Sequence, residues 1–171
     1  MGQVLTLDAV LAWRRELAQT GRTVVFTNGH FDLLHVGHVR YLQAARALGD
    51  ALIVGLNSDA STRARKPGRP IVPQAERAEL LAALGCVDAV VIFDDLTANA
   101  LVTALRPDIY AKGGDWSRPD GPRPPEAEIV AGYGGRVVFL PYITERSTTA
   151  LIEKIVEQSL LARSETGQSY T

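Results

Sequence analysis

Residues 27–38 read TNGHFDLLHVGH and hold all three histidines of the chain. A β-branched and aromatic run at 23–26 precedes this stretch, and an apolar pattern of helical period at 39–48 follows it. The two flanks therefore predict a buried strand and a helix. His35 and His38, spaced as HxGH, are expected where the strand turns into the helix.

A helix start suits phosphate binding, because its first N–H groups are unpaired and carry a partial positive charge. Gly37 allows the backbone to approach a ligand closely, and two imidazoles can donate hydrogen bonds to one polyphosphate. The HxGH spacing favours this interpretation over surface-loop or core histidines. For His30 alone, a functional role and the role of an ordinary surface-loop or core histidine are equally supported.

The composition bounds the remaining possibilities. With 171 residues, one domain at 1–162 is expected. A formal net charge of −1 gives no overall basic field for nucleic acid, and Cys86 as the single cysteine excludes an intrachain disulfide or a CxxC pair. No leader-like or membrane-length segment is recognised, so we expect a cytoplasmic protein with neither a membrane nor a nucleic-acid partner.

Short apolar runs alternate with helical patterns along the chain. The expected strands are 23–26, 51–56, 89–93, 108–111 and 136–140, and the expected helices are 38–48, 74–84, 97–105, 125–132 and 147–161. This alternation predicts an α/β, Rossmann-like, doubly wound sheet of five parallel strands in the order 3-2-1-4-5, with helices on both faces. A helix at 7–18 is expected as an addition, 58–73 and 113–125 as long loops, and 163–171 as a disordered tail.

Two further segments are expected beside the histidines. In a 3-2-1-4-5 sheet, strands one and four are neighbours, and ligands bind at their carboxyl ends. Residues 112–115 (KGGD) follow strand four, and residues 146–149 (RSTT) open the last helix. Hydroxyls, unpaired amides and an arginine at a helix start form an anion site, although RSTT alone is equally consistent with an ordinary N-cap.

Together these motifs resemble the cytidylyltransferase-like nucleotidyltransferases, which share HxGH, and within them the adenylyltransferase domain of bacterial ADP-heptose synthesis. The resemblance spans 23–155. Besides HxGH, it is carried by LGD at 48–50, NSDAS at 57–61, GRPI at 68–71, ERAE at 76–79, KGGDW at 112–116, YGG at 133–135 and STTALIEKI at 147–155. HxGH alone indicates the superfamily, whereas KGGD together with RSTT is typical of a narrower group within it.

The resemblance implies transfer of an adenylyl group from ATP to D-glycero-β-D-manno-heptose 1-phosphate, giving ADP-heptose and pyrophosphate. It implies Mg²⁺ that bridges phosphate oxygens without a dedicated set of protein ligands. It also implies a separate heptose kinase that supplies the sugar phosphate, and a homodimer.

The resemblance also assigns roles to residues. The implied catalytic residues are His35, His38 and Lys66. The implied nucleotide-binding residues are Thr27, Asn28, Gly29, His30, Phe31, Lys112, Gly113, Asp115, Arg146, Ser147 and Thr148. The implied substrate-binding residues are Asp32, Asn57, Asp59, Arg77 and Trp116. For Asp32 the alternative is that it fixes its loop, and for Arg77 the alternatives are a structural role or, almost equally, a surface helix position. No residue is implied as a metal ligand.

Alternative functions stay open. Cytidylyl transfer to a polyol phosphate such as glycerol 3-phosphate and adenylyl transfer to FMN keep the chemistry and change the substrates. The glycerol 3-phosphate enzymes carry arginines at the positions of Gly85 and Tyr142, and the absence of these arginines here disfavours that alternative. The heptose enzymes commonly have cysteine or a small residue at the position of His30 and tyrosine at the position of Trp116, so this chain departs from their pattern at both. A nucleotide-binding module without catalysis is disfavoured by the intact HxGH, Lys66 and RSTT.

Overall fold

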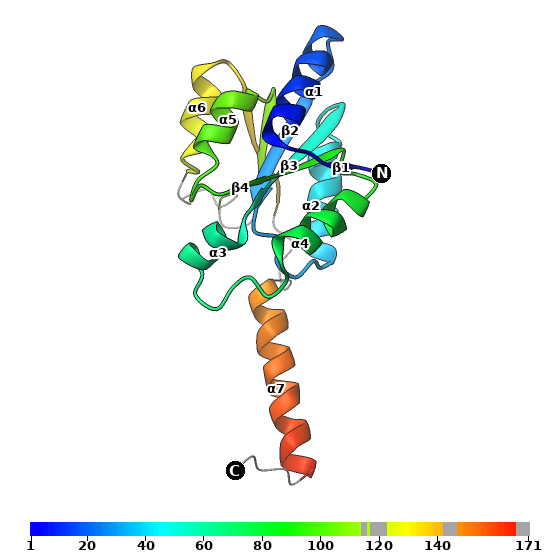
Figure 1. The fold of residues 1–171 in the computed structure, drawn as a ribbon, viewed down its shortest axis with the longest axis vertical. Coiled ribbons are helices and arrows are strands. Elements are labelled where there is room, and N and C mark those ends of the chain that lie inside the picture. Colours follow the sequence, from blue (N-terminus) through cyan, green and yellow to red (C-terminus); the bar gives the residue numbers. More distant parts are fainter. Residues whose placement is uncertain (114–115, 117–122, 142–146, 167–171) are drawn as a thin grey trace.

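The computed structural model describes residues 1–113, 116, 123–141 and 147–166, and Figure 1 shows its ribbon. The strands are β1 (Gln3–Val4), β2 (Val24–Gly29), β3 (Ala51–Asn57), β4 (Ala89–Phe93), β5 (Ile109–Lys112) and β6 (Arg136–Phe139). The helices are α1 (Leu7–Gln19), α2 (Val36–Arg46), α3 (Asp59–Arg65), α4 (Gln74–Ala83), α5 (Asn99–Leu105), α6 (Glu126–Gly132) and α7 (Thr148–Thr166).

The described strands form one parallel sheet in the order β1-β4-β3-β2-β5-β6. The five predicted strands correspond to β2–β6, and their predicted order is confirmed. The predicted number of strands is wrong by one, because β1 adds an edge where Gln3 pairs with Ala89. A strand of two residues is too short to show the alternation that predicts a strand.

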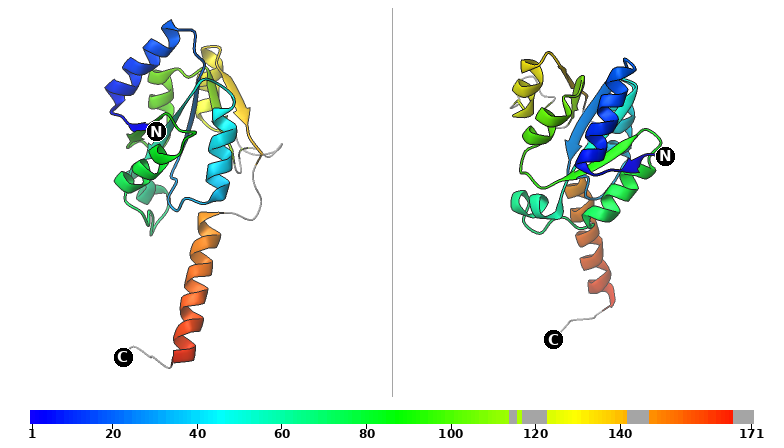
Figure 2. Two further views of the ribbon diagram at one scale, coloured as in Figure 1. Left: turned by 90° about the vertical axis from the view of Figure 1, so that its right-hand side faces the viewer. Right: turned by 45° about the horizontal axis from the view of Figure 1, so that its top comes forward.

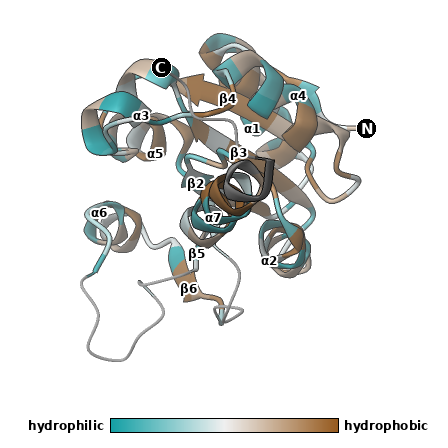
Figure 3. Cartoon of the chain, turned by 90° about the horizontal axis from the view of Figure 1, so that it is seen from below, coloured by the Kyte–Doolittle hydropathy of each residue, from teal (hydrophilic) through white to brown (hydrophobic). Residues whose placement is uncertain are grey.

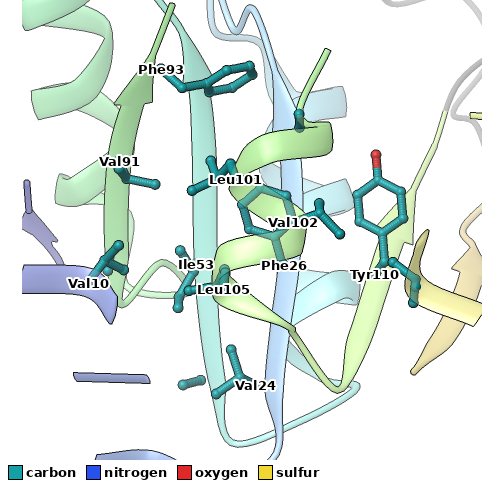
Figure 4. Packing of buried hydrophobic residues seen from close by; sticks show 14 of the residues in the cluster. Val10, Val24, Phe26, Ile53, Val91, Phe93, Leu101, Val102, Leu105 and Tyr110 are labelled. Carbon is teal, nitrogen blue, oxygen red and sulfur yellow. The ribbon is translucent and has the colours of Figure 1, made fainter. Parts of the chain in front are cut away.

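The helices cover the two faces of the sheet in two groups. Successive strand residues point to opposite faces, so Val24 and Phe26 join the core beneath α1, α5 and α6, whereas Val25 joins the core beneath α2 and α4. Figure 2 shows these layers from two further directions, and Figure 4 shows the packing of the first core. Seen from below, α5 and α6 lie on one side of the row of strands and α2 and α4 on the other (Figure 3).

Two local predictions are wrong beside the sheet. The segment 58–73 is not wholly loop, because Ser58 caps α3 by accepting a hydrogen bond from the Ser61 amide at 3.2 Å. Helix α2 begins at Val36 rather than at residue 38, since His35 adopts the extended backbone of an N-cap (φ −140°, ψ 168°). His38 therefore lies inside the first turn of α2.

Helix α7 leads away from the body of the domain (Figures 1 and 2). It runs to Thr166, so 163–166, expected in the tail, are helical, and 167–171 lie outside the described residues. None of the helices in the described ranges combines bilayer-spanning length with sufficient apolarity.

Candidate active site

The ends of the central strands open into a cleft of about 470 Å³, which is also bordered by the starts of α2 and α7. The strand order reverses here, with β3 on one side of β2 and β5 on the other, and such switch points bind ligands. The predicted site residues that line the cleft are Asn28, Gly29, His30, Phe31, Asp32, His35, His38, Asn57, Lys66, Lys112, Gly113, Trp116, Ser147 and Thr148.

The two HxGH imidazoles lie side by side in this cleft. The rings of His35 and His38 are stacked, with their centroids 3.9 Å apart and an interplanar angle of 26°. The His38 amide donates to the His35 carbonyl at 2.9 Å, which closes the first turn of α2. Burial, then the neighbouring His35 and Lys66, lower the pKa of His38 to about 4. His38 is therefore neutral at neutral pH and can donate only one hydrogen bond.

Phe31 holds this pair from the side of the loop between β2 and α2. Its backbone is left-handed, with φ 43°, a conformation that bulky residues rarely adopt and that clusters at functional sites. Its ring packs edge-on against His38, with centroids 5.3 Å apart, and is buried. The strained turn therefore positions the second histidine through ring packing.

Asp32 fixes the loop that follows α3. Its Oδ1 accepts hydrogen bonds from the amides of Ile71 (2.8 Å) and Val72 (3.0 Å), and its Oδ2 pairs with Arg69 Nη1 at 2.7 Å. Burial opposes ionisation, but the hydrogen bonds from Val72 and Arg69 hold the pKa of Asp32 below its usual value. Asp32 lines the cleft, and its bonds to Arg69, Ile71 and Val72 hold the loop in place.

Three cations face the cleft from the segment after β3. Lys66 directly follows α3 as its C-cap residue, and Arg65 and Arg69 lie on either side of it. Lys66 was expected in the long loop 58–73, but it lies at the end of a helix, since its amide donates to the Thr62 carbonyl at 2.9 Å. The segment gives this wall of the cleft a positive charge suited to phosphates.

Lys112 brings a fourth cation to the floor of the cleft. It is buried, its Nζ donates to the Asn28 carbonyl at 3.3 Å, and it lies 5.5 and 5.8 Å from the ring centroids of Tyr110 and Trp116. Burial lowers the pKa of Lys112 to about 8. Among the described residues the amine has one carbonyl partner for its three N–H donors, so it can bind an anion that enters the cleft.

Arg77 does not line the cleft, so the surface alternative is wrong, and the burial and contacts of this side chain support the alternative of a structural arginine. It is fully buried. Its guanidinium donates to the carbonyls of His30, Val72 and Asn57 and pairs with Asp59 at 2.7 Å. Asp59 is therefore engaged outside the cleft as well. The ion pair of Arg77 and Asp59 thus lies outside the cleft and supports the backbone of the residues that line it.

Thr27 also lies behind the cleft, because it is fully buried and its hydroxyl contacts Tyr41 Oη at 2.7 Å. Tyr41 in turn donates to the Ala111 carbonyl at 3.0 Å, so β2 and β5 are tied through one side chain of α2. The Tyr41 ring packs against Gly113, where a Cβ would lie 2.8 Å from a ring carbon. The packing against Tyr41 thus requires a glycine at position 113, the first glycine of KGGD.

Ser147 and Thr148 place the start of α7 at the cleft. Ser147 Oγ accepts from the Ala150 amide at 3.1 Å, so this serine is an N-cap as well as a lining residue. Thr148 Oγ1 donates to the Leu33 carbonyl at 3.4 Å, which joins α7 to the histidine loop. Asp115 and Arg146 lie outside the described residues.

Several residues at the site were not predicted. Arg65 and Arg69 lie in the segment 58–73, which was expected as a long loop, and the direction of their side chains depends on α3. Thr62 and Glu126 carried no signal, although both reach the cleft wall. Glu126 is buried and accepts from the Ala98 amide at 2.8 Å, a contact between segments far apart in the sequence.

The cytidylyltransferase-like family model matches residues 26–152. The chain belongs to this family. Membership of the cytidylyltransferase-like family makes the chain a nucleotidyltransferase, in keeping with the HxGH motif at the head of α2.

Two curated proteins and one solved structure are also similar to this chain. "Bifunctional protein HldE" of Syntrophotalea carbinolica is 54% identical over 143 residues, covering 81% of this chain and 28% of that protein. HldE of Geotalea uraniireducens is 51% identical over 154 residues, covering 90% and 31%. The chain thus spans less than a third of these relatives. A crystal structure of the lipopolysaccharide core biosynthesis protein from Thermoplasma volcanium is 28% identical, with a TM-score of 0.56, and the match covers 74% of this chain and 100% of that one.

Proposed function

We propose that the chain transfers AMP from ATP to D-glycero-β-D-manno-heptose 1-phosphate, forming ADP-heptose and pyrophosphate. The observation that carries the nucleotidyl transfer is the stacked pair of His35 and His38 at the start of α2, in a cleft that also receives Lys66 and Lys112. This arrangement collects hydrogen-bond donors and positive charge where a polyphosphate would lie.

The reaction needs alignment more than proton transfer. A phosphate oxygen of the sugar phosphate attacks the α-phosphorus of ATP, the bond from that phosphorus to the bridging oxygen breaks, and pyrophosphate leaves with the electron pair. The acceptor oxygen is already ionised at neutral pH, so no general base is required. The two imidazoles and Lys66 stabilise charge on the α-phosphate and on the leaving bridge oxygen, while Ser147 and Thr148 bind the terminal phosphates.

Mg²⁺ is proposed as part of the ATP substrate. Among the described residues, no group of three His, Cys, Asp or Glu side chains is arranged to hold a metal, and the oxygens of Asp32 are already taken by Arg69, Ile71 and Val72. Imidazoles and lysines are poor ligands for a hard cation, whereas phosphate oxygens are good ones. When bound, the ion would neutralise phosphate charge beside Lys66.

The heptose acceptor is supported by the narrower motifs. KGGDW and RSTT resemble the ADP-heptose adenylyltransferase domain, and Lys112 and Trp116 of that motif line the cleft. The relatives named HldE and the lipopolysaccharide core biosynthesis protein agree with a sugar phosphate. Since the proposed acceptor is a sugar phosphate, we propose that a kinase activity supplies it, and that the protein acts in the cytoplasm as a homodimer.

Pyrophosphate release tests the proposal. The protein is incubated with MgCl₂, ATP or CTP, and heptose 1-phosphate, glycerol 3-phosphate or FMN in separate reactions. We expect turnover with ATP and heptose 1-phosphate. Preference for CTP and glycerol 3-phosphate, or dependence on FMN, would replace the acceptor assignment, and no turnover with any pair would overturn nucleotidyl transfer.

A further inference from the structure

His30 is the cleft histidine outside the HxGH pair, and the proposed mechanism leaves its side chain without a role. Its Nδ1 lies 3.0 Å from Oγ1 of Thr62 in α3. Its carbonyl accepts a hydrogen bond from the buried Arg77. The backbone and the ring of His30 are therefore each held by a separate partner.

The hydroxyl of Thr62 sets the direction of the bond to the ring. Thr62 is fully buried, and among the described residues His30 Nδ1 is the hydrogen-bond partner of its hydroxyl. A buried hydroxyl hydrogen without an acceptor is costly. Thr62 therefore donates its hydrogen, and Nδ1 of His30 accepts it.

Burial and the surrounding positive charges keep the ring of His30 neutral. Burial has the largest effect, and the neighbouring cations, in decreasing order of effect, are Lys66, Arg65, Arg77 and Lys112. Together they lower the pKa of His30 to about 4. A neutral imidazole carries one hydrogen, so a ring that accepts at Nδ1 carries it at Nε2. In the described part of the chain no hydrogen bond engages Nε2, and His30 lines the cleft.

We propose that His30 is a third imidazole donor of the cleft: Thr62 fixes its tautomer, and Nε2–H binds a phosphate oxygen of a substrate. This rests on the proposed function, which places phosphates in the cleft. Lys66 and Arg65 supply charge beside the ring, whereas the neutral imidazole supplies a single directed hydrogen bond. The phosphate belongs either to ATP or to the acceptor, and the experiments distinguish these sources.

Nitrogen spectra of the full chain, labelled with ¹⁵N-histidine, report the tautomer without any turnover. The three histidines are assigned by comparison with His30→Gln. At about pH 7 we expect His30 in the neutral form protonated at Nε2, and a shift of Nε2 when ATP alone or heptose 1-phosphate alone is added. The ligand that produces the shift identifies the source of the phosphate. A form protonated at Nδ1, a charged ring, or no shift with either ligand overturns the proposal.

Kinetics of matched variants supply the second test. Thr62→Val removes the donor and is expected to raise the KM of one phosphate substrate about three- to tenfold, the scale of one hydrogen bond, while Thr62→Ser recovers most of the loss. The control is Thr103→Val on α5, whose exposed hydroxyl donates to the Asn99 carbonyl at 2.8 Å. Unchanged KM values for both substrates in a folded Thr62→Val protein overturn the proposal.

A pair of substitutions at His30 itself separates the two ring nitrogens. The amide nitrogen of His30→Gln reaches the position of Nε2, whereas that of His30→Asn reaches only the position of Nδ1. We expect His30→Gln to retain the lower KM of the two, and the reverse order counts against Nε2–H as the donor. Absence of turnover in the unmodified protein overturns the proposed function instead, because the nitrogen spectra test His30 independently.

Discussion

The imidazole rings of His35 and His38 are stacked with their centroids 3.9 Å apart, one before and one after Gly37. Two rings this close cannot both carry a charge without strong repulsion. Burial and this neighbour lower the pKa of His38 to about 4. His38 is therefore neutral at neutral pH and offers a directed hydrogen bond, while the nearby lysine and arginine side chains bring positive charge to the cleft.

Removing one ring of the pair should impair the chemical step. We expect His35→Ala to lower kcat on the order of 10² to 10³, the scale for losing one donor to a transition state, measured as pyrophosphate release. Val36→Ala is the matched control, because Val36 lies in the same turn and is exposed. Equal turnover of His35→Ala and Val36→Ala would remove His35 from the mechanism.

Asp32→Asn should destabilise the fold in a pH-dependent manner. Because the pKa of Asp32 is lower in the folded protein, its stabilisation is fully present above the ordinary aspartate pKa of about 4 and is lost as the pH falls through the native pKa. We expect the variant to lose about 1–3 kcal/mol of unfolding free energy near pH 7. Urea unfolding at about pH 7 and pH 3 checks this. A loss of the same size at both pH values would contradict it.

The pH dependence of kcat/KM should contain a contribution from Lys112. Its pKa of about 8 means that the free enzyme loses this charge as the pH rises through 8, and phosphate binding should weaken with it. We expect the kcat/KM of the unmodified protein to fall above about pH 8. In Lys112→Met we expect kcat/KM to be lower than in the unmodified protein and to show no such fall. In Lys112→Arg the fall in kcat/KM should move to higher pH. If the fall stays at the same pH in this variant, it is caused by the titration of another group.

Arg77 should matter for stability more than for binding. Arg77→Leu leaves Asp59 and three carbonyls without their shared donor, and we expect it to lose about 3–5 kcal/mol, the scale for breaking a buried ion pair. Urea unfolding measures the loss, and Arg77→Lys should lose less because a charge remains. Glu79→Ala on the exposed face of the same helix is the control. A loss below about 1 kcal/mol in Arg77→Leu would show that the fold does not depend on it.

Much of the architecture could be predicted because it rests on local patterns. The alternation of apolar strands and amphipathic helices is visible in the sequence, and the order β4-β3-β2-β5-β6 is that of a doubly wound sheet with right-handed crossovers. The edge strand β1 and helix α3 could not be predicted in this way. β1 has two residues, and α3 forms where Ser58 caps a segment rich in arginine, serine and threonine that shows no apolar period.

The candidate site could be predicted where a residue and its motif share one segment. His35, His38, Lys112 and Ser147 follow strand ends or open helices, and all four line the cleft. Arg77 and Thr27 could not be placed, because a short polar stretch does not reveal whether a side chain points into a cleft or behind it. The bond between His30 and Thr62 joins residues 32 positions apart, so only the packing of α3 reveals it.

Arg77 joins three parts of the chain through one guanidinium, since it binds the carbonyls of His30 and Asn57 and the carboxylate of Asp59. These partners belong to the histidine loop, the end of β3 and the first turn of α3. A displacement of one part would stretch bonds to the other two. The hydrogen-bond donors of the histidine loop and the cations after α3 therefore keep a fixed spacing. The cleft is preorganised, with its shape set before a substrate binds.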